Sequence, residues 1–153
     1  MKINKLKNDY KNDGYVVIKN FFSKKKISNI KKEIINNLEK KINKFYYEKI
    51  NKINKLRRIE KISDFSPNTK KLIKSRDVIN TLKILENNKF VLFKDKLNFK
   101  FPGGRGFLPH IDGHFFWEDE NKKYNIGWKK YSENFINLVV PLEKTNKKNG
   151  CLL

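Results

Sequence analysis

A histidine and an aspartate two residues apart, His110 and Asp112, are the side chains of this sequence best suited to bind a metal ion. They lie in the stretch FPGGRGFLPHIDGHFFW, residues 101–117, which also holds four of the chain's seven glycines. In an extended strand, residues i and i+2 point to the same side, so these two side chains share a face. His-x-Asp is two-thirds of the facial triad of two histidines and one carboxylate that holds non-haem Fe(II). The competing interpretation is a hydrogen-bonded His/Asp pair without a metal.

His114 is the other histidine of the chain, and the geometry of a strand argues against it as the third ligand. Each strand residue advances about 3.3 Å, which separates His110 from His114 by roughly 13 Å. Metal–nitrogen bonds of about 2 Å cannot bridge that distance without a tight fold at Gly113. We expect His114 to lie beside the metal ligands or to face the substrate.

Arg105 stands in the glycine-rich segment GGRG, residues 103–106, shortly before the His/Asp pair. A cation on a loop of this kind could engage an anionic substrate through a carboxylate or phosphate group. Arg105 is therefore a candidate substrate contact.

The net charge of +20 makes nucleic acid a partner to consider. However, Lys, Asn and Ile make up nearly half of the chain, while Ala and Gln are absent, and AT-rich codons would give the same bias. The lysines are also spread from Lys2 to Lys148. We therefore do not expect nucleic acid as the partner, and an anionic small molecule fits the charge equally well.

The length of 153 residues predicts one domain. No apolar run approaches the roughly 18 residues that a membrane span needs. The start, MKINKLKNDYKNDG, lacks the apolar region of a secretory signal. A single cysteine, Cys151, cannot form an internal disulfide, so we expect a cytoplasmic protein without a membrane association.

The first half of the chain is predicted to be mainly helical after one early strand. The strand is GYVVIKNFF, residues 14–22, a β-branched and aromatic run that begins after an aspartate. Ser23 is a plausible N-cap for an amphipathic helix, whose apolar residues follow at steps of three and four from Ile27 to Phe45. This pattern continues loosely through Leu56.

A loop over DFSPNTKK, residues 64–71, is predicted next, because a proline disfavours helical geometry in the residue before it. A second short helix follows in residues 75–88. Beyond it, four short aromatic or β-branched segments predict strands; they cover residues 89–95, 97–101, 107–112 and 135–142. Helices first and strands later indicate an α+β fold, with helices outside a mostly antiparallel sheet or barrel.

Three blocks of this sequence resemble the phytanoyl-CoA dioxygenase-like family of Fe(II)/2-oxoglutarate oxygenases. DGYVVIKNFFSKKKISNIKKEI looks like the family's opening strand and helix. LNFKFPGGRGFLPHID is similar to its lysine–proline–glycine lead into the His-x-Asp strand. INLVVPLEKTNKKNGCLL looks like the strand and turn that follow.

The resemblance implies N-terminal helices packed on a double-stranded β-helix (a jelly-roll, cupin-like core) in which His110 and Asp112 bind Fe(II). It implies that 2-oxoglutarate and O₂ are consumed while a small organic substrate is hydroxylated. Lys100 stands where some members direct a lysine toward the 2-oxoglutarate carboxylate. Val139 replaces a tryptophan of many members, and Asn137 shares its strand face, so Asn137 is a second candidate co-substrate contact.

The family's second metal histidine and its co-substrate arginine lie on strands that follow the NGCL segment. We therefore interpret residues 1–153 as a single incomplete oxygenase domain, the N-terminal portion of a longer enzyme. Residues 1–88 would be mainly helical, and residues 89–153 would supply the first strands of the β-helix core. Two alternatives stay open: a basic module that binds nucleic acid through lysines of the helix Ile27–Leu56, or a cupin-like remnant without activity.

Overall fold

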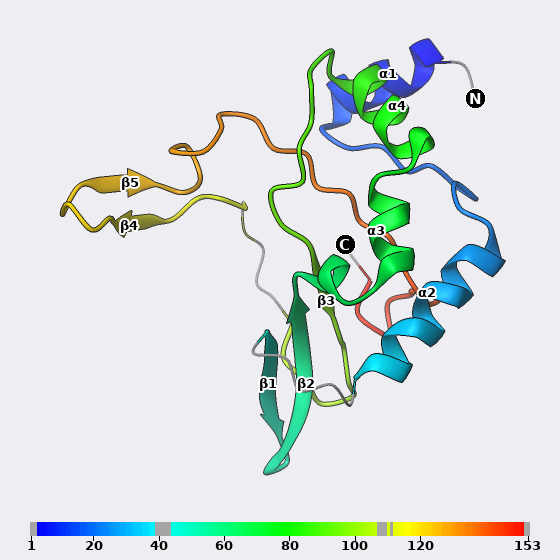
Figure 1. Ribbon diagram of the computed structural model, residues 1–153, viewed down its shortest axis with the longest axis vertical. Coiled ribbons are helices and arrows are strands. Elements are labelled where there is room, and N and C mark those ends of the chain that lie inside the picture. The colour runs from blue at the N-terminus through cyan, green and yellow to red at the C-terminus, as the bar shows by residue number, and fades with distance from the viewer. Residues whose placement is uncertain (1–2, 39–43, 107–109, 111, 152–153) are drawn as a thin grey trace. The chain divides into compact units, whose positions relative to one another are not determined.

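The computed structural model describes residues 3–38, 44–106, 110 and 112–151 (Figure 1). The chain divides into two compact units, Met1–Phe101 and Pro102–Leu153. The first unit contains four helices, a short 3-10 helix and a three-stranded sheet, and the second contains a two-stranded sheet. Mixed helices and antiparallel sheets place the chain in the α+β class, as predicted. The single incomplete domain predicted over residues 1–153 stays a prediction.

The sheet of the first unit has the strand order β1-β2-β3 and is antiparallel throughout. Its strands are β1 (Phe45–Ile50), β2 (Ile53–Glu60) and β3 (Lys96–Asn98). The two-residue turn between β1 and β2 has positive φ at both Asn51 (48°) and Lys52 (66°), the geometry that matches the twist of a tight hairpin.

The prediction of a helix that continues loosely to Leu56 is therefore wrong. Apolar residues at positions 50, 53 and 56 happen to repeat every third residue, but Asn51 and Lys52 turn the chain back. Aromatic residues at the start of β1 favour a strand, and Ile59 of β2 is fully buried in the resulting sheet.

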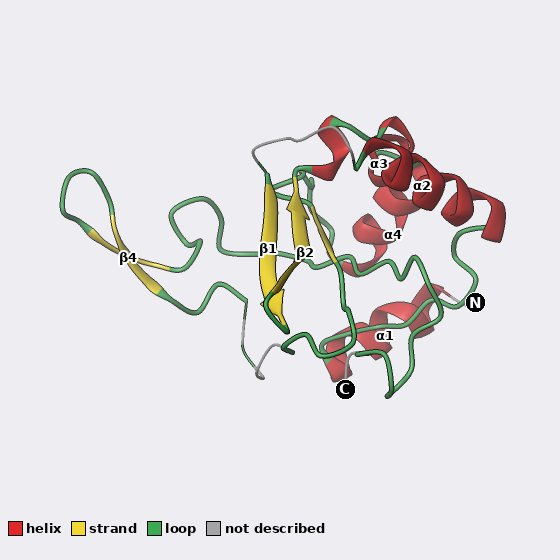
Figure 2. Cartoon of the chain, turned by 90° about the horizontal axis from the view of Figure 1, so that it is seen from below, coloured by secondary structure: helices red, strands yellow, loops and turns green. Residues whose placement is uncertain are grey.

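The helices of the first unit lie to one side of this sheet (Figures 1 and 2). Helix α1 packs against α4, and α2 packs against α3. The bounds of these helices are α1 (Ile3–Asp13), α2 (Lys24–Asn37), α3 (Pro67–Ile73) and α4 (Arg76–Leu85), and the 3-10 helix η1 spans Ile62–Asp64. The core is aliphatic and consists of Leu6, Ile30, Ile34, Ile59, Ile62, Leu72, Val78 and Leu85.

Helix α2 begins where the sequence predicts. The side chain of Ser23 accepts a hydrogen bond from the backbone N–H of Lys26 (3.2 Å), which satisfies one of the free donors at the helix start. Ile30 and Ile34, four residues apart, form its buried stripe. The predicted second helix, residues 75–88, corresponds to α4.

The prediction of a strand over residues 14–22 is wrong. Gly14 has a φ of +75°, and its N–H donates to the carbonyl of Tyr10 (3.0 Å), so it ends α1 as a left-handed cap. The residues after it form no strand, and Tyr15 and Val17 are 67% and 68% exposed.

The prediction of a loop over residues 64–71 is also wrong, because Pro67 occupies the first position of α3. Proline is favoured there, since its missing N–H would have no partner within the helix. The fully buried Ser66 caps α3 by accepting from the N–H of Thr69 (3.2 Å). Glu33 of α2 accepts from Ser66 Oγ (2.7 Å) and from the N–H of Asn68 (3.1 Å), which ties α2 to the start of α3.

Two of the four strands predicted after residue 88 are not formed in the described chain, since residues 89–95 and 135–142 are irregular. A strand needs a hydrogen-bonded neighbour, and no described segment pairs with these two. β3 overlaps the start of the predicted 97–101 segment. Within the predicted segment 107–112, all but His110 and Asp112 lie outside the described residues.

The second unit is built on the hairpin of β4 (Phe116–Glu118) and β5 (Tyr124–Ile126), which are antiparallel. Asp119 organises the turn by accepting from the N–H groups of Asn121 and Lys123, both at 3.0 Å. None of the described helices, in either unit, has both the length and the hydrophobicity that crossing a lipid bilayer requires.

Candidate functional site

The structure brings His110 and Asp112 together in the second unit. His110 Nε2 lies 3.4 Å from Asp112 Oδ1, and the two side chains are 56% and 36% exposed. His110 belongs to no strand, and Asp112 begins the turn that leads toward β4. The two side chains therefore lie close together without the strand that their spacing predicted.

The geometry of this pair fits one divalent metal ion. Two ligands about 2.1 Å from a shared ion, with roughly a right angle between their bonds, lie about 3 Å apart. The 3.4 Å between His110 Nε2 and Asp112 Oδ1 is close to that separation. An imidazole nitrogen and a carboxylate oxygen are also the donor types that Fe(II) takes in oxygenase sites.

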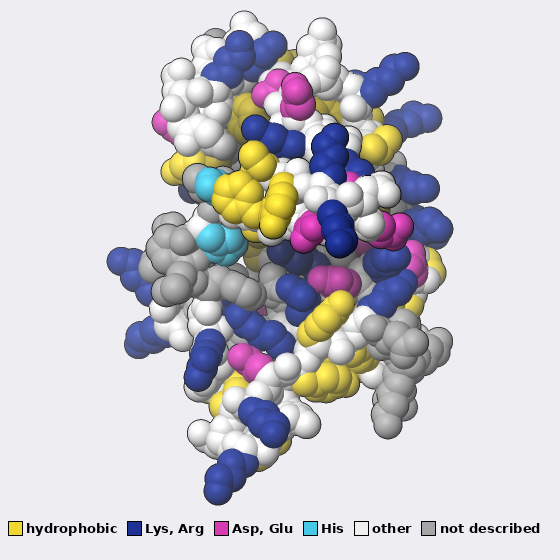
Figure 3. Space-filling model, turned by 90° about the vertical axis from the view of Figure 1, so that its left-hand side faces the viewer, with side chains coloured by type: hydrophobic (Ala, Val, Ile, Leu, Met, Phe, Trp, Pro, Cys, Tyr) yellow, Lys and Arg dark blue, Asp and Glu magenta, His cyan; other side chains and the backbone are white. Residues whose placement is uncertain are grey.

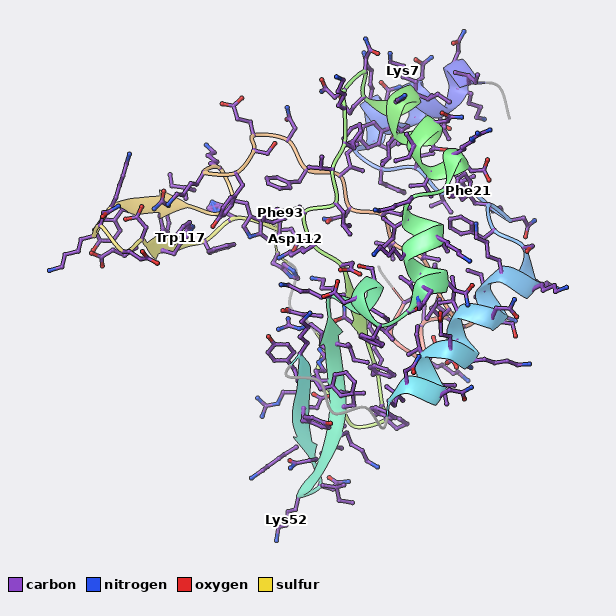
Figure 4. All side chains as sticks on the ribbon, viewed as in Figure 1. Lys7, Phe21, Lys52, Phe93, Asp112 and Trp117 are labelled. Atoms are coloured by element: carbon purple, nitrogen blue, oxygen red, sulfur yellow. The ribbon has the colours of Figure 1, made fainter. Side chains whose placement is uncertain are left out.

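Asn137 completes the surroundings of the carboxylate. Its Nδ2 donates a hydrogen bond to Asp112 Oδ2 (3.0 Å) across 25 residues of sequence. The two oxygens of Asp112 therefore have different neighbours: Oδ1 faces His110, and Oδ2 accepts from Asn137. Figure 4 labels Asp112 and, on the adjoining hairpin, Trp117.

Two glycines allow the hairpin to approach the backbone directly after Asp112. Gly113 has a φ of +83°, and a Cβ there would lie 3.3 Å from Trp128 Cε3. Gly127 has a φ of +51°, and a Cβ there would collide with the carbonyl of Gly113. The N–H of Gly127 donates to the carbonyl of Phe115 (2.5 Å). Glycine at both positions thus lets two segments meet next to the candidate metal ligand.

An aromatic cluster holds these segments together. Trp128 packs edge-on against Phe115 (centroids 6.1 Å apart) and against Phe135 (5.3 Å). Edge-to-face pairs at these separations contribute stability beyond the area that they bury. Because Phe135 precedes Asn137 by two residues, the cluster positions the segment that carries the Asn137 amide.

A second contact group surrounds Trp117 of β4. Its Nε1–H donates to the carbonyl of Gly127 (2.7 Å), and its ring stacks on Tyr131 with centroids 6.4 Å apart. Lys130 Nζ lies 5.4 Å from the centre of the Trp117 ring and 3.2 Å from Asp119 Oδ2. Hydrogen bonds from the backbone of Lys123 and from the Lys130 ammonium lower the pKa of Asp119 to about 2.

The remaining predicted site residues are exposed. Arg105 precedes the pair in the second unit, and the His114 ring packs edge-on against Phe116 (6.5 Å). Lys100 belongs to the first unit, two residues after β3. Both histidine side chains reach the surface, and appear in cyan in Figure 3.

No group of three or more His, Cys, Asp or Glu side chains that could hold a metal ion occurs in the part of the chain that the structure describes. The site there consists of two candidate metal ligands and the Asn137 amide. Sequence reasoning named these three residues but missed the support from Gly127, Trp128 and Phe135. The adjacent glycine and tryptophan, Gly127 and Trp128, were the available signal.

Comparison with known proteins gives the family. The model of the family described as phytanoyl-CoA dioxygenase (PhyH) matches residues 10–153. "Dioxygenase lolE1" from Epichloe uncinata is 28% identical over 107 residues, which are 70% of this chain and 37% of that protein. "2-aminoethylphosphonate dioxygenase" from the uncultured bacterium HF130_AEPn_1 is 32% identical over 95 residues, which are 62% of this chain and 32% of that protein.

The matched residues thus span about a third of the length of these two curated relatives. No solved structure matches the chain. The family match covers both units, including the His110/Asp112 pair and the hairpin that follows it. This chain belongs to the phytanoyl-CoA dioxygenase family.

Proposed function

We propose that this chain is the N-terminal part of an Fe(II)/2-oxoglutarate-dependent dioxygenase that hydroxylates a small organic substrate. The observation that carries the proposal is the 3.4 Å approach of His110 Nε2 to Asp112 Oδ1 in a chain of the phytanoyl-CoA dioxygenase family. His110 and Asp112 would supply two of the three protein ligands. The third ligand, and an arginine for the co-substrate, would come from residues outside this sequence.

Each residue then has a defined task. Fe(II), when bound, would supply the site at which 2-oxoglutarate and O₂ react. The imidazole of His110 and the carboxylate of Asp112 hold the ion on one side, and their exposure leaves its other side open. Lys100 would bind a carboxylate of 2-oxoglutarate, as a compact cation suited to a single carboxylate oxygen.

The proposed architecture is a double-stranded β-helix with the helices outside. Antiparallel pairing in both units and helices on one side of the β1-β2-β3 sheet support it.

We propose an anionic substrate. The chain carries a net charge of +20, and Arg105 and His114 flank the metal pair in sequence. One relative is named for its action on 2-aminoethylphosphonate, a compound with an anionic phosphonate group. A guanidinium group suits such an oxyanion because it can donate two parallel hydrogen bonds.

The nucleic-acid alternative loses its structural basis. It relied on a helix from Ile27 to Leu56, but the hairpin β1–β2 occupies the second half of that segment. On the face shown in Figure 3, Lys and Arg side chains are interspersed with Asp and Glu. The oxygenase proposal predicts that the chain binds the metal ion, whereas the inactive-remnant alternative predicts that it does not.

The test is an anaerobic calorimetric titration of the 153-residue chain with Fe(II). We expect His110→Ala and Asp112→Ala each to abolish the specific binding of one Fe(II) ion, because one remaining side chain cannot hold it. His114→Ala is the matched control, a second exposed histidine four residues away, and should bind as the unmodified chain does. Unchanged binding in both His110→Ala and Asp112→Ala would refute the proposal.

A further inference from the structure

The carboxylate of Asp112 is held by one directed hydrogen bond. Its side chain is 36% exposed, and the terminal torsion of an aspartate is broad, so an isolated carboxylate would present either oxygen to its surroundings. The bond from Asn137 Nδ2 to Oδ2 (3.0 Å) removes that freedom. As a result Oδ1 is the oxygen that stays 3.4 Å from His110 Nε2.

The backbone that carries Asn137 is held near Asp112 by packing. Phe135, two residues earlier, lies against Trp128, and Trp128 lies against Gly113, the residue directly after Asp112. The segments that carry the donor and the acceptor thus both contact the Trp128 ring. A support of this kind makes the orientation of a metal ligand precise.

We propose that Asn137 is a positioning residue for the metal site: its amide holds Asp112 Oδ2, so that only Oδ1 binds the metal ion together with His110 Nε2. This inference rests on the proposed function. A carboxylate bound through one oxygen occupies one coordination position, which leaves more positions for the co-substrate and O₂ than a carboxylate bound through both. Asn137 therefore acts through Asp112 and does not contact the metal.

A titration with Co(II) as the metal tests this on the full chain. We expect Asn137→Ala, and the nearly isosteric Asn137→Leu, each to weaken Co(II) binding by about 10-fold or more, the usual effect of removing a partner of a metal ligand. Both variants are compared with the chain in which Asp112 is intact, because Asp112→Ala is expected to abolish the site by itself. Asn134→Ala is the matched control, since Asn134 makes its hydrogen bonds through its backbone.

The outcomes separate the competing explanations. Full binding by both Asn137 variants would overturn the positioning role. Tryptophan fluorescence of each variant checks that Trp117 and Trp128 keep their environment, so a loss of binding is not a loss of folding.

A metal-free measurement distinguishes failure of this inference from failure of the proposed function. The side-chain amide signal of Asn137 in a ¹⁵N NMR spectrum should shift in Asp112→Ala, because its acceptor is removed. An unshifted signal overturns the inference by itself. A shifted signal in a chain that binds no Co(II) through His110 and Asp112 overturns the metal site, and the positioning role with it, while the hydrogen bond stands.

Discussion

Gly127 lies against Gly113 so closely that a Cβ on Gly127 would collide with the Gly113 carbonyl. This contact joins the end of the β4–β5 hairpin to the residue that follows Asp112. Gly127 also has a φ of +51°, in the left-handed region that favours glycine. The shape of the chain at the candidate metal site therefore depends on a glycine 15 residues further along the sequence.

Gly127→Ala should destabilise the second unit. The left-handed backbone alone costs about 1–3 kcal/mol for a residue with a side chain, and the collision adds to this cost. Both tryptophans of the chain, Trp117 and Trp128, lie in the second unit, so tryptophan fluorescence during urea unfolding reports on that unit. Gly106→Ala is the control, because no atom of the described residues lies within 4 Å of a Cβ there. Equal midpoints for the two variants would contradict the close approach.

Ser66→Ala should destabilise the first unit by about 1–2 kcal/mol, the usual cost of losing a helix cap. The hydroxyl of Ser66 is buried, caps α3 and donates to Glu33, so its removal also takes one hydrogen bond from the Glu33 carboxylate, which still accepts from the N–H of Asn68. Thermal unfolding followed by helical circular dichroism measures the loss.

The matched control for that change is Ser75→Ala. Ser75 occupies the same N-cap position in α4, but among the described residues it makes no side-chain cap hydrogen bond. A much smaller effect is expected there. Equal losses in the two variants would show that the Ser66 hydrogen bonds contribute nothing.

Asp119 makes the hairpin turn sensitive to acid. Its pKa is lowered from 3.8 to about 2 in the folded chain, first by the hydrogen bond from the Lys123 backbone and also by that from Lys130. A group with a lowered folded pKa stabilises the fold above its unfolded pKa. This stabilisation is complete above about pH 4 to 5 and is lost as the pH falls through about 2.

Fluorescence of Trp117 during acid titration measures this effect, because Lys130 lies over its ring beside Asp119. Asp119→Asn should remove the part of the transition that falls between pH 4 and 2. Glu120→Gln, a change at the exposed neighbouring carboxyl, should leave it in place. An identical acid transition in the Asp119→Asn chain would contradict the assignment.

The sequence correctly predicted an element whose start is set by contacts between neighbouring residues. Ser23 was predicted to cap a helix because its hydroxyl precedes an apolar stripe, and it caps α2 in the structure. The same reasoning failed at Gly14 and Pro67, because each of these residue types is compatible with two local structures. Gly14 ends a helix instead of opening a strand, and Pro67 begins a helix instead of preventing one.

The candidate site, too, could be predicted only in part from the sequence. The spacing of His110 and Asp112 predicted a shared strand face; the two side chains lie 3.4 Å apart, although neither residue belongs to a strand. The hydrogen bond from Asn137 joins residues 25 apart and depends on the packing of Trp128 against Phe135, which no local pattern encodes. Position on a strand face placed Asn137 near the site, although the described segment around it forms no strand.

We propose above that His110 and Asp112 bind one metal ion together. The chain has two histidines, so its imidazole ¹⁵N NMR spectrum contains only the rings of His110 and His114. In a titration with Zn(II), which accepts the same imidazole and carboxylate donors, we predict a shift of His110 Nε2, unchanged nitrogens in His114, and loss of the His110 shift in Asp112→Ala. Parallel shifts of the two rings, or no shift of His110, would contradict the account.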